Sequence, residues 1–454
     1  MKRYLLGTAA LSTAAGAAAL LALAMPAMAG GKTKIDFWYG NSGHISEVVQ
    51  QVCKNFNDSQ QDYTIVCTSQ GSYAAAVQNT IAAYRAGQQP TIVQVFDVGT
   101  LDLMLSDAYY PASKLMADEG YKVDWNNYLP GIRGYYATSK GEMYSFPFNS
   151  STALLYWNKD AFQKIGKTAA PATWEEAAED MKALKAAGYA CPFGFDITAD
   201  ESWQFLEQFS AVNNEPLATK DNGYGGLDAE LVFNKTKFVK YITDLKSWYD
   251  QGLAVIKDEQ AGQDMVAAFA SGDCQMILTS VGDHGTVGST AKPGMNWSVA
   301  MLPVYEGVKR HSSLVGGASL WVLAGKSPEE YKAAAAFLNF IAQPEQALFW
   351  STNTGYIPVT KTGYDYMVSH GFYDDPKYKG REIAIASLTA SDELSATHGT
   401  RMGGFLQIRN EVANGWQAIF ANKVSVQEGI DGMVERGNAI LRRFEATYKG
   451  KQLP

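Results

Sequence analysis

Seven short segments rich in Gly, Ser, Thr and Tyr hold the residues best suited to bind a small polar molecule. They are residues 71–73, 96–100, 149–152, 279–282, 316–319, 353–356 and 401–404. Ligands of open α/β sheets bind at the carboxyl ends of strands, where hydroxyls and backbone N–H groups converge. The segments therefore predict a cleft that binds a small polar solute without transforming it.

Residues that could carry catalysis or hold a metal are not grouped in a recognisable pattern. The sequence contains no G-x-S-x-G, no HExxH and no complete P-loop, and its five histidines show no ligand spacing. We expect neither a metal nor a cofactor. A glycosidase with paired carboxylates stays open on sequence alone, because acidic residues are plentiful. No two acids stand in loops flanked by the aromatic residues that hold sugars.

The N-terminus predicts export. Residues 1–29 form a signal peptide, with Lys2 and Arg3 before an Ala/Leu run and Ala27-Met28-Ala29 before the cleavage site. Its removal takes the net charge from −8 to about −10. An acidic, exported chain with no basic run is not expected to bind nucleic acid.

Alternating elements predict an α/β protein with two sheets. Strands at 34–39, 63–67 and 91–96 alternate with helices at 44–56 and 74–86, which implies parallel strands with right-handed crossovers. A second run begins at Leu154, with strands at 275–279, 297–302 and 319–323. Further helices are expected at about 203–212, 236–251, 262–270, 328–342, 344–352, 381–389 and 408–447.

Four cysteines remain in the exported chain. We expect Cys53–Cys67 to join a helix to the next strand and Cys191–Cys274 to form the second disulfide, since export permits pairing. Buried free thiols are the alternative.

Several segments carry a resemblance to a known family. They include Pro147–Asp160 (PFNSSTALLYWNKD), Gly316–Val322 (GGASLWV), Thr354–Pro358 (TGYIP) and Gln407–Arg409 (QIR). With these motifs the chain resembles the extracellular solute-binding proteins of ABC importers, of the maltose-binding-like class. More narrowly, it resembles the periplasmic sn-glycerol-3-phosphate-binding proteins, over essentially the whole mature chain.

The resemblance implies a two-lobed periplasmic binding protein fold of type II, each lobe a mostly parallel sheet flanked by helices. It divides the chain into an N-terminal lobe of residues 30–148 and 317–354 and a C-terminal lobe of residues 149–316 and 355–454. The stretch Phe148–Thr152 is then the first hinge crossing between the lobes. The implied protein is a periplasmic monomer that delivers its ligand to the permease and ATPase subunits of an importer.

The family's ligand contacts fall on seven residues of this sequence, which are Tyr73, Asp97, Ser151, Ser280, Gly317, Tyr356 and Arg409. By resemblance, Asp97 accepts hydrogen bonds from glycerol hydroxyls, where enteric members have Glu. Gly317 supplies a backbone donor, and Tyr356 and Arg409 complete the grip on phosphate. This agrees with general chemistry, since a guanidinium with hydroxyl and N–H donors binds phosphate well.

One departure from the family concerns a tryptophan that stacks on the ligand. Here residues 196–202 contain no Trp, and Trp203 is expected to lie in the core. A missing stacking wall favours a bulkier head group, such as that of glycerophosphocholine. The alternatives are a binding protein for an oligosaccharide and, less favoured, a secreted glycosidase or phosphodiesterase.

Overall fold

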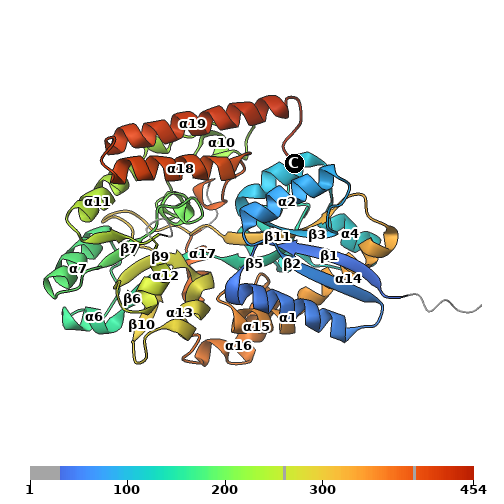
Figure 1. Ribbon diagram of the computed structural model, residues 1–454, viewed down its shortest axis with the longest axis horizontal. Helices are drawn as coiled ribbons and strands as arrows, with labels where there is room; N and C mark the ends of the chain where they lie inside the picture. Colours follow the sequence, from blue (N-terminus) through green and yellow to red (C-terminus); the bar gives the residue numbers. More distant parts are fainter. Residues whose placement is uncertain (1–30, 259–261, 392–394) are drawn as a thin grey trace, which may run out of the picture.

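The computed structural model describes residues 31–258, 262–391 and 395–454, which form two lobes side by side (Figure 1). The signal peptide predicted for residues 1–29 lies outside the described residues. Each lobe contains one sheet, and helices cover the faces of both sheets. Two neighbouring lobes with separate sheets are the arrangement that the resemblance predicted, although the residue boundaries given above stay a prediction.

The first sheet has the strand order β2-β1-β3-β11-β4, and β5 also pairs with β11. Its strands are β1 (Thr33–Tyr39), β2 (Tyr63–Ser69), β3 (Ile92–Phe96), β4 (Tyr109–Tyr110), β5 (Phe146–Ser151) and β11 (Gly316–Leu323). Its lobe holds α1 (Gly43–Ser59), α2 (Tyr73–Arg85), α3 (Thr100–Ser106), α4 (Ala112–Asp118), α5 (Pro130–Tyr136), α14 (Pro328–Ile341) and α15 (Pro344–Asn353). β1 runs parallel to β2 and β3, as the alternation of strands and helices predicted.

The second sheet has the order β10-β6-β9-β7-β8. Its strands are β6 (Ala153–Asn158), β7 (Phe193–Phe195), β8 (Ala254–Ile256), β9 (Met276–Ser280) and β10 (Trp297–Ala300). The remaining helices are α6 (Lys159–Lys164), α7 (Trp174–Ala186), α8 (Ser202–Phe205), α9 (Glu207–Val212), α10 (Thr219–Asn222), α11 (Phe238–Asp250), α12 (Met265–Ala270), α13 (His284–Thr290), α16 (Lys361–Ser369), α17 (Glu382–Leu388), α18 (Phe405–Phe420) and α19 (Val426–Thr447).

Both sheets are mixed rather than mostly parallel. β11 runs antiparallel to β3, β4 and β5, and β6 runs antiparallel to β9 and β10. The cause is the chain path, because β5 leads directly into β6 of the other lobe and β11 brings the chain back. A strand that returns from the opposite lobe enters the sheet in the reverse direction.

Three passages of the chain between the lobes lie side by side at the end of β5. The Thr152 hydroxyl donates to the carbonyl of Leu314 at 2.8 Å, which joins the first passage to the second. The N–H of Ile357 donates to the carbonyl of Ser150 at 2.9 Å, which joins the first to the third. The small polar side chains predicted at a hinge are thus buried, and contacts between passages satisfy Thr152 without any ligand.

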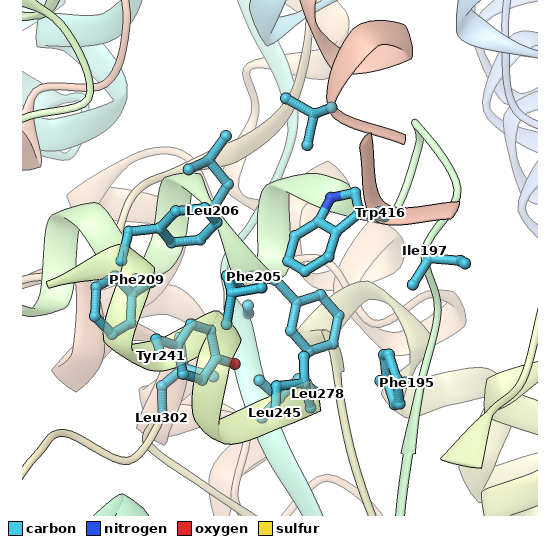
Figure 2. Close-up of a cluster of buried hydrophobic side chains, with 14 of the residues drawn as sticks. Phe195, Ile197, Phe205, Leu206, Phe209, Tyr241, Leu245, Leu278, Leu302 and Trp416 are labelled. Atoms are coloured by element: carbon cyan, nitrogen blue, oxygen red, sulfur yellow. The ribbon is translucent and has the colours of Figure 1, made fainter. Parts of the chain in front are cut away.

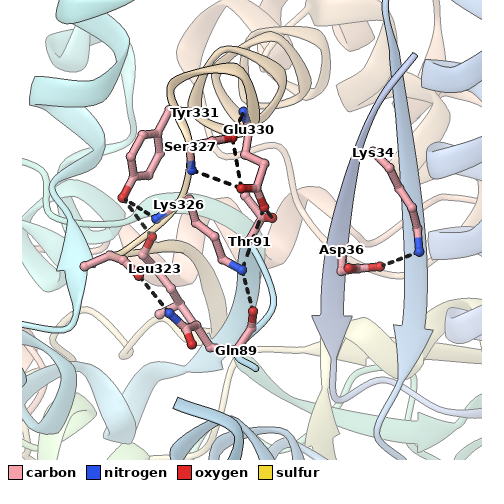
Figure 3. A network of polar contacts seen from close by, with 10 residues as sticks. Lys34, Asp36, Gln89, Thr91, Leu323, Lys326, Ser327, Glu330 and Tyr331 are labelled. Carbon is pink, nitrogen blue, oxygen red and sulfur yellow. Dashed lines mark hydrogen bonds and ion pairs between the residues drawn. The ribbon is translucent and has the colours of Figure 1, made fainter. Parts of the chain in front are cut away.

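The end of the first sheet that lies away from these passages is fixed by polar contacts at the start of α14 (Figure 3). Ser327 and Glu330 form a capping box there, and the Thr91 hydroxyl donates to the Glu330 carboxylate at 3.2 Å. Lys326 Nζ donates to the carbonyl of Gln89 at 2.6 Å. These bonds tie the beginning of β3 to the end of β11, so both strands reach the lobe boundary in a fixed register.

The largest core lies mainly in the second lobe and holds α18 in place (Figure 2). Trp416 of α18 packs edge-on against Phe205 of α8, with ring centroids 6.3 Å apart. Phe420, one turn further along α18, meets Phe195 of β7 at 5.1 Å. Fully burying such rings stabilises the fold by about 1.5–3 kcal/mol each.

One long helical stretch was predicted over 408–447, and the structure divides it. α18 ends at Phe420, Asn422 takes a positive φ of 56°, and α19 begins after a capping box of Ser425 and Glu428. The Asn422 conformation reverses the chain, so that α18 and α19 pack against each other. The two disulfides, Cys53–Cys67 and Cys191–Cys274, are both confirmed.

Candidate functional site

A cavity of about 530 Å³ lies between the lobes, and all seven predicted ligand residues line it. Tyr73 begins α2, Asp97 follows β3, Ser151 ends β5, Ser280 ends β9, Gly317 lies in β11, Tyr356 follows α15 and Arg409 lies in α18. Both lobes therefore supply the wall. Six of the seven Gly/Ser/Thr/Tyr segments contribute to it, whereas residues 401–404 do not, because they lead into α18 elsewhere on the lobe boundary.

A buried network of amides orients the Tyr73 hydroxyl. The side-chain amides of Asn41 and Asn149 donate to it at 3.0 and 2.9 Å, and Gln94 donates to both asparagines at 2.8 Å. Because the Tyr73 oxygen accepts two bonds, its own hydrogen is left to be donated. It lies 3.4 Å from the Tyr356 hydroxyl, so the two phenols act as one polar edge of the cavity.

Arg409 is buried and joins the two lobes through carboxylates. Its Nε and Nη2 donate to the two oxygens of Glu207 at 2.8 and 2.9 Å, and Nη2 lies 3.4 Å from Asp97. Burial acts against the charge of Arg409, but Glu207 and Asp97 outweigh it and raise the pKa of the guanidinium. The bonds to Glu207 and Asp97 use Nε and Nη2, which leaves the hydrogens of Nη1 for an anion.

Asp97 lies beside Arg409 in the wall of the cavity. Its carboxylate accepts from the N–H groups of Val98 at 2.7 Å and Gly317 at 3.2 Å. Burial raises the pKa of Asp97 to about 6, although Arg409 opposes the rise and Glu207 adds to it. The N–H of Gly317, predicted as a donor to ligand, is used here by Asp97. Each carboxylate oxygen of Asp97 thus accepts one backbone N–H, which fixes the side chain in the cavity wall.

Gly317 occupies a position that no other residue fits without strain. Its φ is +121°, and an added Cβ would lie 2.1 Å from the carbonyl oxygen of Asn149. We expect Gly317→Ala to lower the free energy of unfolding by about 2–3 kcal/mol, since both strain and overlap oppose it. Denaturant unfolding measures the change.

The matched control is Gly288→Ala in α13, where an added Cβ meets nothing within 4 Å. There we expect a gain of about 0.5–1 kcal/mol, because Ala is the better helix former. Equal effects at both positions would contradict the assignment of strain to Gly317.

Two serines present hydroxyls to the cavity. Ser151 is only 3% exposed, and its hydroxyl makes no hydrogen bond to another residue of the described chain. Ser280 accepts from the N–H of Gly282 at 2.9 Å, which leaves its own hydrogen for a ligand. The Ser151 hydroxyl is reached from the cavity, so a polar solute bound there could be its hydrogen-bond partner.

Trp203 is partly buried and packs against the core of the second lobe, but it also lines the cavity, which its predicted place in the core did not include. The short helix α8 follows the loop after β7 and places the indole at the lobe boundary, where its ring faces the backbone of Gly316. An aromatic wall is therefore present, supplied by Trp203 rather than by a residue within 196–202. The prediction of a site without a tryptophan is corrected accordingly.

Sequence reasoning missed four carboxylates near the cavity. Asp200, Glu201 and Asp283 line it, and Glu207 holds Arg409. No sequence signal marks them, because the chain has 46 acidic residues and none of these four belongs to a motif.

A larger groove of about 1100 Å³ is lined by residues of the C-terminal segment 445–454 and the turn at 137–141. None of the seven predicted ligand residues lines this groove. Within the described ranges, no group of three or more His, Cys, Asp or Glu side chains is arranged to hold a metal ion. A search of the same residues finds no helix that is long and apolar enough to span a membrane.

The chain belongs to the bacterial extracellular solute-binding proteins, whose family model matches residues 51–380. Among individual relatives, the sn-glycerol-3-phosphate-binding periplasmic protein UgpB of Escherichia coli O1:K1 is 39% identical over 437 residues. The match covers 94% of this chain and 97% of that protein. UgpB of Salmonella paratyphi A is 38% identical over 445 residues, covering 96% and 98%.

Solved structures confirm the two-lobed binding-protein fold. UgpB from Mycobacterium tuberculosis in complex with glycerophosphocholine matches with a TM-score of 0.75 at 22% identity, covering 91% of this chain and 100% of that one. The sugar-binding protein MalE from Xanthomonas citri matches with a TM-score of 0.70 at 19% identity, covering 92% and 100%.

Proposed function

We propose that the protein is the periplasmic solute-binding component of an ABC importer for glycerol-3-phosphate or glycerophosphodiesters such as glycerophosphocholine. The observation that carries this proposal is the cavity between the lobes that all seven predicted residues line, where Arg409 and Asp97 share a space with several hydroxyls. The arginine and hydroxyl donors suit a phosphate, and the aspartate suits glycerol hydroxyls. The names of the relatives support the same solutes.

Capture by closure of two lobes on a hinge suits this arrangement, because ligand groups from both lobes meet only when the lobes are together. The loaded protein then delivers its solute to the permease, which the ATPase subunits power. Neither step requires the binding protein itself to carry out a chemical reaction, and we propose a monomeric protein without enzymatic activity.

Calorimetric titration with glycerol-3-phosphate, glycerophosphocholine and maltose tests this function. We expect saturable one-to-one binding of at least one phosphate compound, near the −8 kcal/mol of a micromolar site, and no heat with maltose. Binding of maltose alone would favour the oligosaccharide alternative. Release of free choline, glycerol or sugar during incubation would instead indicate an enzyme.

A further inference from the structure

Negative charge prevails around the proposed ligand cavity. Among the described residues that line it, Arg409 is the one Lys or Arg, against the carboxylates of Asp97, Asp200, Glu201 and Asp283. Arg409 is already paired through two nitrogens with Glu207, which is itself only 5% exposed. An anionic ligand therefore meets one cation whose charge is largely balanced.

A second space of about 660 Å³ adjoins the acidic side of this cavity. The two spaces share Asp200, Glu201 and Asp283, and the second adds Asp196 and Asp264. The other described residues that line this second space include neither Lys nor Arg. A ligand longer than glycerol phosphate could therefore place its far end among carboxylates without leaving the lobe boundary.

The ionisation of two of these acids is opposed by their surroundings. Burial, together with repulsion from Asp283, Asp196 and Asp200, raises the pKa of Glu201 to about 8. Burial, with repulsion from Asp264, raises the pKa of Asp283 to about 6. A cation placed between such groups removes the repulsion and favours their charged forms.

Two further features are independent of the acids and indicate a ligand at the same wall. Trp203 lines the same cavity as Glu201, two positions before it in the chain, and aromatic faces and carboxylates both attract ammonium groups. The unpartnered hydroxyl of Ser151, on a residue 97% buried, lies in the same wall. Together they place a polar ligand against the tryptophan.

On the basis of the proposed function, we infer that the site prefers phosphodiesters with a positively charged head group, and that Asp200, Glu201 and Asp283 receive that head. A phosphate monoester brings about two negative charges near neutral pH, whereas a diester brings one. An ammonium head offsets that one charge and meets the acidic wall. Electrostatic fit then ranks a zwitterionic diester above a diester with a neutral head, and both above the monoester.

The test compares three ligands by calorimetry at pH 8 and fixed ionic strength: glycerophosphocholine, glycerophosphoglycerol and glycerol-3-phosphate. We expect glycerophosphocholine to bind at least about tenfold more tightly than glycerophosphoglycerol, with glycerol-3-phosphate weakest. In the double variant Glu201→Gln/Asp283→Asn, affinity for glycerophosphocholine should fall at least about fivefold while affinity for glycerol-3-phosphate stays equal or rises.

The opposite response of two ligands in one variant separates a head-group role from damage to the fold. The double variant Asp228→Asn/Glu411→Gln removes the same charge from residues outside both spaces and should leave all three affinities unchanged. Equal affinities for the three ligands, or an equal loss of all three in the first variant, would overturn the inference while the proposed function stands. No binding of any ligand by the unmodified protein would overturn the function itself.

Discussion

Arg409→Met is expected to weaken binding of the phosphate ligand by about 100-fold or more. Hydrogen bonds to charged groups contribute about 1.5–3 kcal/mol each, and 1.4 kcal/mol corresponds to a tenfold change in affinity. Loss of two such bonds accounts for the expected effect. Calorimetry with glycerol-3-phosphate and glycerophosphocholine measures it.

The same substitution should also destabilise the protein, because it leaves Glu207 and Asp97 as buried carboxylates without their cation. Removing one partner of a buried ion pair costs about 3–5 kcal/mol. Replacing Glu207 as well, in Arg409→Met/Glu207→Gln, should restore much of the stability but none of the affinity. Restored stability without restored affinity would show that Arg409 binds the ligand in addition to stabilising the fold through its ion pair with Glu207.

Arg436→Met is the matched control for the arginine. Arg436 lies in α19, is paired with Glu411 at the surface and does not line the cavity. We expect unchanged affinity and a stability change within about 0.5 kcal/mol. Wild-type affinity in Arg409→Met would show that the phosphate is bound elsewhere.

Removal of the Cys191–Cys274 disulfide should destabilise the protein more than removal of Cys53–Cys67. The first joins residues 83 apart in the sequence and the second residues 14 apart. On the chain-entropy model, loops of these lengths correspond to about 4.5 and about 3 kcal/mol. Cys→Ala pairs, compared by denaturant unfolding, measure the two values.

The two disulfides also act in different lobes. Cys53–Cys67 links α1 to β2, while Cys191–Cys274 links the residues before β7 and β9 in the second sheet. The decisive result is which of the two disulfides, when removed, lowers the free energy of unfolding more. A larger loss from the Cys53 pair would show that loop length does not control their contributions.

The fold could be predicted from sequence where local patterns decide it. The helix-strand alternation from β1 to β3 follows from hydrophobic periodicity, and the structure reproduces it within a few residues. The division between α18 and α19 was missed because apolar spacing is helical on both sides of Asn422. The capping-box pattern of Ser425 and Glu428 could have indicated that a second helix, α19, begins there.

The residues of the site were harder to predict from the sequence than the fold, because folding brings them together from distant parts of the chain. Tyr73 and Arg409 are 336 positions apart, and it was the family resemblance, not spacing, that selected them. Glu207 and Asp283 gained their importance from tertiary contacts with Arg409 and the cavity wall. The contact of Trp203 with the cavity was missed because the sequence of a short helix after a strand does not reveal which of its side chains face a cavity.

The pairing of Arg409 with Glu207 has a consequence for how the solute leaves. Both residues belong to the second lobe, so their two hydrogen bonds persist when the lobes separate and a departing ligand leaves no isolated buried cation. Release of the solute then costs Arg409 its bonds to the ligand but not its neutralising partner. A binding protein with this arrangement can bind its solute tightly and still release it when the importer separates the lobes.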